Sequence, residues 1–277
     1  MEYNLTEHCN LTCHGCNHAS PLFPERFASL DGYERDLLAL SAVLVADELR
    51  IVGGEPLLHP GLVDFLKIGK SSGIARRTVL YTNGVLLHEA PPEMWQLIDE
   101  LWVSVYAGAP LRLSVEALAV IAADHGVRLR PYAVDTFGVT LLNQPIVERE
   151  LVEQVFRTCD LAHAWSCHAI YEGRYYKCAQ APFLEYRMSR LGRTVRNLID
   201  DGVPLHDNPD LQGTLRRYLD DSRPLLACTY CLGTAGPKLP HRLLGSKAKW
   251  AWLDEDHTEA IADTRDRLLG TGGPPVR

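Results

Sequence analysis

The sequence predicts an α/β fold: a partial (β/α)6-type barrel followed by a small C-terminal domain that contains a β-hairpin. Strand-like and helix-like segments alternate along the first 150 residues, which is typical of βαβ units that form a parallel sheet. About 150 residues accommodate five or six such units, whereas a complete eight-fold barrel needs about 250. The second part of the chain has a different pattern, with short strand-like segments on both sides of a two-residue turn.

A local sequence pattern predicts each strand and helix of the first part. The expected strands are short apolar runs bounded by turn residues: 3–6, 48–52, 78–81, 101–106 and 127–132. The expected helices are 31–46, 62–70, 92–100 and 114–125. Asp31 is the expected N-cap of the first helix, and Gly126 is suited to end the last. Because the carboxyl ends of parallel strands meet at one edge, we expect functional residues in the loops that follow them.

In the second part, residues 169–171 and 174–176 flank Glu172-Gly173 and are expected to form the hairpin. Residues 200–213 are rich in Asp, Pro, Asn and Gly and predict a loop, and residues 214–219 predict a helical turn. A disordered tail is expected from Gly270. The expected division is a partial barrel (1–150), a hairpin-containing domain (151–240) and a C-terminal helix and tail (241–277).

The composition of the chain excludes several classes of function. The chain has 277 residues with 28 basic and 35 acidic side chains, a formal charge of −7, and its basic residues do not cluster, which argues against a nucleic-acid partner. It has no apolar run of membrane-spanning length and does not start with a signal-peptide pattern. We therefore expect a cytoplasmic protein without a membrane partner. In a reducing cytosol, its eight cysteines indicate metal or redox chemistry rather than disulfides.

The first cysteine group is a short loop after the first strand, with the pattern Cys-x3-Cys-x2-Cys formed by Cys9, Cys13 and Cys16. Three thiolates suit a four-iron cluster in which one iron stays open. Three histidines are nearby: His8, His14 and His18. A zinc site with three cysteines and one histidine is therefore the alternative.

Gly53-Gly54-Glu55-Pro56 follows the second strand, and together with the cysteine loop it resembles the motifs of the radical S-adenosylmethionine (SAM) superfamily. The resemblance implies a [4Fe-4S] cluster whose open iron chelates SAM. It implies that the backbone of Gly53 and Gly54 approaches the amino group of SAM and that Glu55 accepts a hydrogen bond from it. It further implies cofactor contacts from Asn83, after the third strand, and from Ser104 on the fourth.

The same resemblance implies a reaction class. Members of this superfamily cleave SAM reductively to a radical that removes hydrogen from an unactivated carbon. We therefore expect an enzyme served by a flavodoxin- or ferredoxin-type electron donor. The sequence departs from the family at Gly15, where an aromatic residue usually packs on the adenine, and His14 is a candidate to replace that contact.

Five cysteines form the second group: Cys159, Cys167, Cys178, Cys228 and Cys231. Counting outward from the hairpin turn brings Cys167 opposite Cys178, and Cys228-x2-Cys231 supplies a second pair. These four are the predicted ligands of an auxiliary site, for which a zinc ribbon is the alternative. The element Gly173-x4-Cys178 resembles the twitch and SPASM modules of radical SAM enzymes, which implies a second [4Fe-4S] cluster. The spacing in those modules also fits Cys159, so either Cys159 or Cys167 is the fourth ligand.

Enzymes with such modules include aminocyclitol dehydrogenases and sugar epimerases of antibiotic biosynthesis, and others that modify peptides. A peptide-modifying enzyme is less favoured because few residues precede Cys9 and 46 follow Cys231. A non-enzymatic iron–sulfur electron carrier is also considered, but that function would not account for the Gly-Gly-Glu motif. We expect a small carbohydrate substrate and a sugar epimerase, in which the spare thiol of Cys159 is the catalytic hydrogen donor. A dehydrogenase, which needs no such donor, is the alternative.

Overall fold

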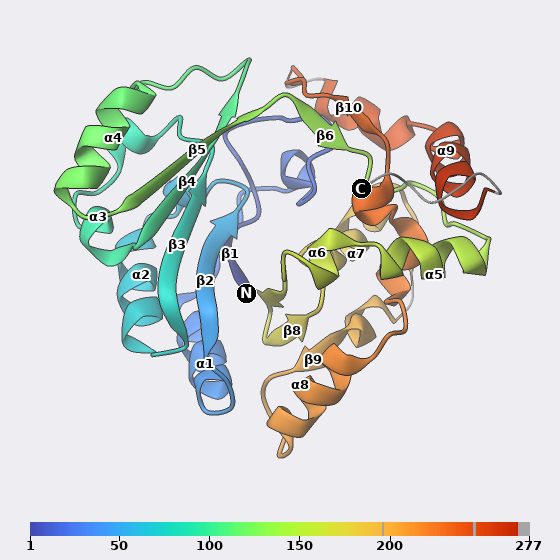
Figure 1. Ribbon diagram of the computed structural model, residues 1–277, viewed down its shortest axis with the longest axis horizontal. Helices are drawn as coiled ribbons and strands as arrows, with labels where there is room; N and C mark the ends of the chain where they lie inside the picture. Colours follow the sequence, from blue (N-terminus) through green and yellow to red (C-terminus); the bar gives the residue numbers. More distant parts are fainter. Residues whose placement is uncertain (196, 246–247, 271–277) are drawn as a thin grey trace.

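The computed structural model describes residues 1–195, 197–245 and 248–270. Its centre is an eight-stranded sheet with the order β5-β4-β3-β2-β1-β7-β8-β9 (Figure 1). The strands are β1 (Glu2–Thr6), β2 (Ala46–Gly53), β3 (Ala75–Thr82), β4 (Glu100–Tyr106), β5 (Arg128–Val134), β7 (Ala169–Tyr171), β8 (Arg174–Tyr176) and β9 (Gly202–Pro204). The neighbours from β5 to β7 are parallel, whereas β8 and β9 are antiparallel. Six parallel strands in an unclosed sheet confirm the predicted partial barrel.

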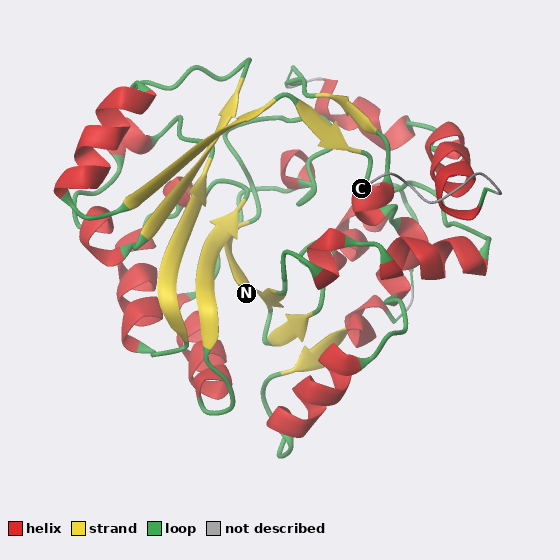
Figure 2. Ribbon diagram, in the orientation of Figure 1, coloured by secondary structure: helices red, strands yellow, loops and turns green. Residues whose placement is uncertain are grey.

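Helices cover the outer face of the parallel strands and build most of the second part (Figure 2). Those of the first part are α1 (Leu30–Ser41), α2 (Leu62–Ser71), α3 (Met94–Leu97) and α4 (Val115–Asp124). Those of the second part are α5 (Arg149–Arg157), α6 (Asp160–His163), α7 (Ala181–Arg190), α8 (Leu211–Asp220) and α9 (Thr258–Leu269). A two-stranded sheet joins β6 (Thr136–Gly138) to β10 (Lys238–Pro240). In the described part of the chain, no helix is long and apolar enough to cross a lipid bilayer.

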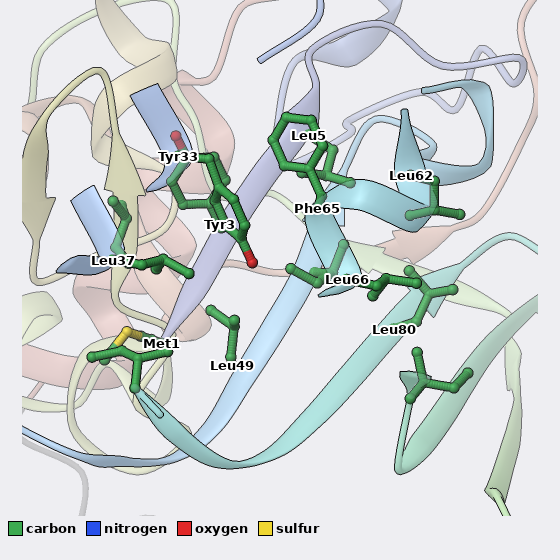
Figure 3. Packing of buried hydrophobic residues seen from close by; sticks show 14 of the residues in the cluster. Met1, Tyr3, Leu5, Tyr33, Leu37, Leu49, Leu62, Phe65, Leu66 and Leu80 are labelled. Atoms are coloured by element: carbon green, nitrogen blue, oxygen red, sulfur yellow. The ribbon is translucent and has the colours of Figure 1, made fainter. Parts of the chain in front are cut away.

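The main hydrophobic core lies between the sheet and helices α1–α4. Along each strand, successive side chains point to opposite faces of the sheet. The outward set includes Leu5, Leu49 and Leu80, which pack with Leu37 of α1 and Phe65 of α2 (Figure 3). Burial of these apolar side chains fixes which residues of each strand face inward.

The inward-facing residues near the strand starts form an ion-pair network. Its members, here the ionic ladder, are Glu2, Glu48, Arg50, Arg77, Glu100, Arg128 and Arg130. Glu100 is buried and accepts hydrogen bonds from Arg77, Arg128 and the indole N–H of Trp102, the last at 2.7 Å. Paired charges thus occupy this end of the inner face, whereas the carboxyl ends of the strands, together with Glu2, line a cavity.

The hairpin forms as predicted. Tyr171 pairs with Arg174 and Ile170 pairs with Tyr175. The turn residues Glu172 and Gly173 have φ values of 46° and 71°, the left-handed pair that a two-residue hairpin turn requires.

Four local predictions need correction or fall outside the description. Ser29, rather than Asp31, caps α1 by accepting the N–H of Gly32, and the helix ends at Ser41. The helix expected over 92–100 is only α3, because Glu100 begins strand β4 within the ionic ladder. The loop expected over 200–213 contains strand β9 and the start of α8, because β9 completes the sheet beside β8. The disordered tail is expected from Gly270 onward, and its residues 271–277 lie outside the described residues.

Candidate functional site

The three cysteines of the first group line one cavity of about 490 Å³ at the carboxyl ends of the parallel strands. This first cavity also has walls from Gly53 of β2 and Ser104 of β4. The cysteine loop contains no α-helix or long strand and is held by distant backbone: Cys13 forms a bridge with Leu243. The segment that follows β10 therefore helps to fix the loop over the strand ends.

The sulfur of Cys9 is surrounded by N–H donors. It accepts hydrogen bonds from the backbone N–H of Leu11 at 3.4 Å and from the side-chain amide of Asn83 at 3.6 Å. Burial raises the pKa of Cys9 to about 12 and also raises the pKa values of Cys13 and Cys16. Buried thiols ionise where N–H donors and a cation stabilise the thiolate. Three such sulfurs on one cavity fit an iron–sulfur cluster.

Gly53 and Gly54 line the first cavity and also touch the chain that leads into the cysteine loop. A Cβ atom at Gly53 would lie 2.5 Å from the carbonyl oxygen of Thr6, and one at Gly54 would lie 2.0 Å from the carbonyl oxygen of His8. Both distances are far shorter than a van der Waals contact, so only glycine fits at these positions. The Gly-Gly pair therefore allows the end of β2 to pack directly against the residues before Cys9.

We expect Gly54→Ala to destabilise the fold by about 3 kcal/mol, because the backbone at His8 must move to admit the methyl group. The displaced loop should also bind less iron. Urea unfolding and iron analysis measure both effects. Gly245→Ala is the matched control, since a Cβ at Gly245 meets no atom within 4 Å. Unchanged stability and iron content in Gly54→Ala would contradict this description of the loop.

Glu55 lies behind the wall of the first cavity rather than on it. Its carboxylate is fully buried and accepts hydrogen bonds from the N–H of Leu57 at 3.0 Å, the hydroxyl of Thr82 at 2.7 Å and the N–H of Asn83 at 2.8 Å. Burial raises the pKa of Glu55 to about 7. In this geometry Glu55 joins the ends of β2 and β3 and orients Asn83, whereas the sequence predicts a direct contact with SAM.

Asn83 and Ser104 both line the first cavity, as the sequence predicts for cofactor contacts. The side-chain amide of Asn83 donates to Asn10 at 2.7 Å, in addition to its contact with Cys9. The hydroxyl of Ser104 donates to the hydroxyl of Tyr132 at 2.6 Å. These contacts place a polar amide and a pair of hydroxyls on neighbouring strand ends.

The three histidines near the cysteine loop have different surroundings. The Nδ1 atom of His8 accepts the N–H of Arg26, and His14 pairs with Glu255 at 2.5 Å beside a smaller neighbouring cavity. Only His18 of the three lines the first cavity, with its ring edge against Phe183. Gly15 has a φ of 70°, which favours glycine over an aromatic residue at that position.

Several residues of the first cavity are absent from the sequence-based list of site residues. Glu2 and Trp165 line it, and Arg50 connects them: its guanidinium lies 3.6 Å from the carboxylate of Glu2 and donates to the backbone oxygen of Trp165 at 3.0 Å. Lys238 of β10 is also on its wall. The alternation of β1 places Glu2 on the inner face, but the approach of Trp165 and Lys238 depends on tertiary structure.

Four cysteines of the second group surround another cavity, here the second cavity: Cys159, Cys178, Cys228 and Cys231. The sulfur of Cys178 accepts the N–H of Gln180 at 3.4 Å, and that of Cys231 accepts the N–H of Gly233 at 3.2 Å. Cys9 has the same contact with the N–H two residues later, as described above. Four thiols around one cavity, two of them with such donors, fit a second cluster.

Cys167 is not among the residues that line the second cavity, although the sequence predicts it as a ligand. Its sulfur lies 3.7 Å from the guanidinium of Arg50, on the side of Glu2. The hairpin ladder ends at Ala169 and Tyr176, and Ser166 has a φ of 49° that turns the chain before it. Cys159, expected as a hydrogen donor, is instead beside the other three cysteines.

The two cavities are adjacent, since Leu161 and Gly233 line both. A Cβ at Gly233 would lie 2.9 Å from the sulfur of Cys159, so Gly233 packs directly against this thiol. Within the described ranges, no three histidine, cysteine, aspartate or glutamate side chains are arranged to hold a single metal ion.

Comparison with known proteins identifies part of the chain. Residues 3–126 match the model of the Radical SAM superfamily, so this part is a radical SAM domain. That domain implies a [4Fe-4S] cluster and SAM, and it confirms the prediction that the chain is an enzyme.

Two curated relatives are GTP 3′,8-cyclases. That of Geobacter sulfurreducens is 36% identical over 98 residues, which cover 34% of this chain and 29% of the relative. That of Chlorobaculum tepidum is 37% identical over 84 residues, which cover 30% of this chain and 25% of the relative. The matches thus span less than a third of these relatives.

Among solved structures, BtrN in complex with AdoMet and 2-DOIA resembles this chain with a TM-score of 0.50 and 18% sequence identity. The likeness covers 83% of this chain and 91% of BtrN. At 18% identity this likeness concerns the fold alone. It supports the partial barrel, and it covers more of the chain than residues 3–126, the part that matches the radical SAM domain.

Proposed function

We propose that this chain, in which residues 3–126 form a radical SAM domain, is a radical SAM dehydrogenase that oxidises an alcohol of a carbohydrate or aminocyclitol to a ketone. The observation that carries this proposal is the set of four cysteines around the second cavity, directly beside the first. When bound, SAM and the first cluster supply a radical that removes hydrogen from carbon, and a second cluster supplies a one-electron acceptor.

The proposed roles follow the two cavities. In the first, Cys9, Cys13 and Cys16 hold the cluster. SAM binds beside them, against the other lining residues expected to contact it: Gly53, Gly54, Asn83 and Ser104. In the second, Cys178, Cys228 and Cys231 are joined by Cys159 as the fourth ligand, the role that the sequence leaves open between Cys159 and Cys167. A flavodoxin- or ferredoxin-type protein is the proposed reductant.

The overall oxidation needs a proton acceptor as well as an electron acceptor. Conversion of an alcohol to a ketone removes a hydrogen atom from carbon, then one proton and one electron. Glu2 presents a buried carboxylate to the first cavity and is held beside Arg50. We assign Glu2 as the group that receives the hydroxyl proton.

The lining of the first cavity supports a hydroxylated substrate without phosphate groups. Its walls carry both aromatic rings and hydroxyl groups: Tyr81, Tyr106, Tyr132, Phe137, Trp165, Thr136, Thr140 and Thr234. Such surfaces suit the apolar faces and hydroxyls of sugar rings. Among the described residues of this wall, Lys238 is the one Lys or Arg side chain. Binding of a nucleoside triphosphate, such as the GTP named for the curated cyclases, requires more than one Lys or Arg side chain to pair with its phosphates.

An epimerase is the second candidate, because a spare thiol remains. Cys167 is partly buried next to Arg50 and Glu2, and Glu2 lines the first cavity. A thiol there can return a hydrogen atom to the opposite face of a substrate carbon, and the thiyl radical that remains then takes up one electron from the second cluster and one proton. In this alternative the donor is Cys167 instead of Cys159.

Product analysis separates the two candidates. The reconstituted enzyme, SAM and dithionite are incubated in deuterated water with unphosphorylated cyclitols, aminocyclitols and hexoses. The dehydrogenase predicts a ketone two mass units lighter than its substrate, with 5′-deoxyadenosine formed alongside. An isomer that carries one carbon-bound deuterium, lost in Cys167→Ala, would instead establish the epimerase.

A further inference from the structure

Gln180 is a buried polar residue of the second cavity with an incomplete set of hydrogen bonds. It is 2% exposed and directly precedes α7. Its side-chain oxygen accepts the thiol of Cys231 at 3.6 Å, and its side-chain nitrogen has no hydrogen-bond partner among the described residues. A buried amide nitrogen without an acceptor is destabilising and needs a physical explanation.

The surroundings of Gln180 offer few acceptors other than sulfur. In the described part of the second cavity, it is the one lining side chain with nitrogen or oxygen atoms. The remaining lining residues are four cysteines, one glycine and apolar residues: Leu141, Val155, Phe156, Leu161, Ala162, Ala181, Leu225 and Ala227. An N–H donor in such a site acts at low local dielectric, where its effect on a nearby charge is large.

Iron binding changes which atom of the Gln180 side-chain amide can form a hydrogen bond with Cys231. As a ligand, Cys231 is a thiolate and has no S–H to donate. Its sulfur then accepts hydrogen bonds, and the amide nitrogen of Gln180, rather than the oxygen, is the matching group. The nitrogen and oxygen of a glutamine amide exchange places by a half-turn. The half-turn places the N–H group where the side-chain oxygen now lies, facing the sulfur of Cys231.

We infer that the side-chain amide of Gln180 donates a hydrogen bond to a sulfur of the second cluster and raises the reduction potential of that cluster. This inference rests on the proposed function for the presence of the cluster. Reduction adds one negative charge to the cluster and makes its sulfurs stronger acceptors, so an N–H donor stabilises the reduced form more than the oxidised form. Gln180 is thus a positioning residue that eases electron acceptance from the substrate.

The test uses Gln180→Met, which keeps a long side chain but has no N–H donor. It is made in the full chain together with Cys9, Cys13 and Cys16 replaced by alanine, so that only the second cluster is observed. A redox titration followed by electron paramagnetic resonance should give a lower midpoint potential, by about 59 mV if the equilibrium constant for reduction falls tenfold. Gln212→Met is the matched control, because Gln212 is exposed on α8.

A second measurement needs no substitution at Gln180. With glutamine side chains labelled by ¹⁵N in the same background, the reduced cluster should show a ¹⁵N hyperfine coupling. Absence of that coupling, or an unchanged potential in Gln180→Met with its iron retained, overturns the inference alone. A background variant that contains no iron overturns the proposed second cluster, and the inference with it.

Discussion

Replacing Cys9, Cys13 and Cys16 together by alanine is expected to abolish reductive cleavage of SAM and to lower the iron content from about eight to about four per chain. The three sulfurs line the same cavity as Gly53, Asn83 and the other proposed cofactor contacts, and alanine provides no ligand for iron. Anaerobic reconstitution, iron analysis and an assay for 5′-deoxyadenosine measure the two losses.

The second group of cysteines is the internal control for this variant. Its four sulfurs lie around a separate cavity, so about four irons should remain bound. If 5′-deoxyadenosine still forms at the wild-type rate, the assignment of the first cavity as the SAM site is wrong.

Cys159→Ala should remove the iron of the second cluster and stop ketone formation, while SAM cleavage continues at the first cavity. The reason is that Cys159 lines the second cavity with Cys178, Cys228 and Cys231. Cys167→Ala is the matched control and should keep all of the iron, since the sulfur of Cys167 lies beside Arg50 instead. Iron analysis and product assays of the two variants give the comparison.

The opposite pattern would contradict this assignment. Loss of iron in Cys167→Ala with full iron in Cys159→Ala would restore the pairing of Cys167 with Cys178 that the hairpin predicts from the sequence. Because bound iron stabilises the fold around it, solubility and secondary structure of both variants are compared by circular dichroism.

Local patterns were sufficient to predict the elements that position the site. The alternation of strands and helices predicts the parallel sheet, and the Glu172-Gly173 turn predicts the hairpin with its register. Both depend on interactions between residues close in sequence or on a regular period, which sequence patterns describe well. The addition of β7 to the edge of β1 joins residues more than 160 positions apart, and no local pattern encodes it.

The same distinction between local patterns and contacts of distant residues explains which residues of the candidate site the sequence predicts. The spacing of Cys9, Cys13 and Cys16 within one loop is a local property, and all three face one cavity. Extending the hairpin register beyond Tyr176 predicts the position of Cys167, but the ladder ends at Ala169 and Tyr176 and the chain bends at Lys177 and Cys178. The motif alone predicts a SAM contact for Glu55, whereas the three groups that donate hydrogen bonds to it come from two separate segments.

The most direct test of the central claim, a second redox cluster beside the SAM site, is elemental analysis of the variant with Cys9, Cys13 and Cys16 replaced by alanine. After anaerobic purification and reconstitution, the variant should contain about four iron and about four sulfide per chain and no zinc. Cys159, Cys178, Cys228 and Cys231 remain intact in it. About one zinc per chain without iron would contradict the account and establish a structural zinc site instead.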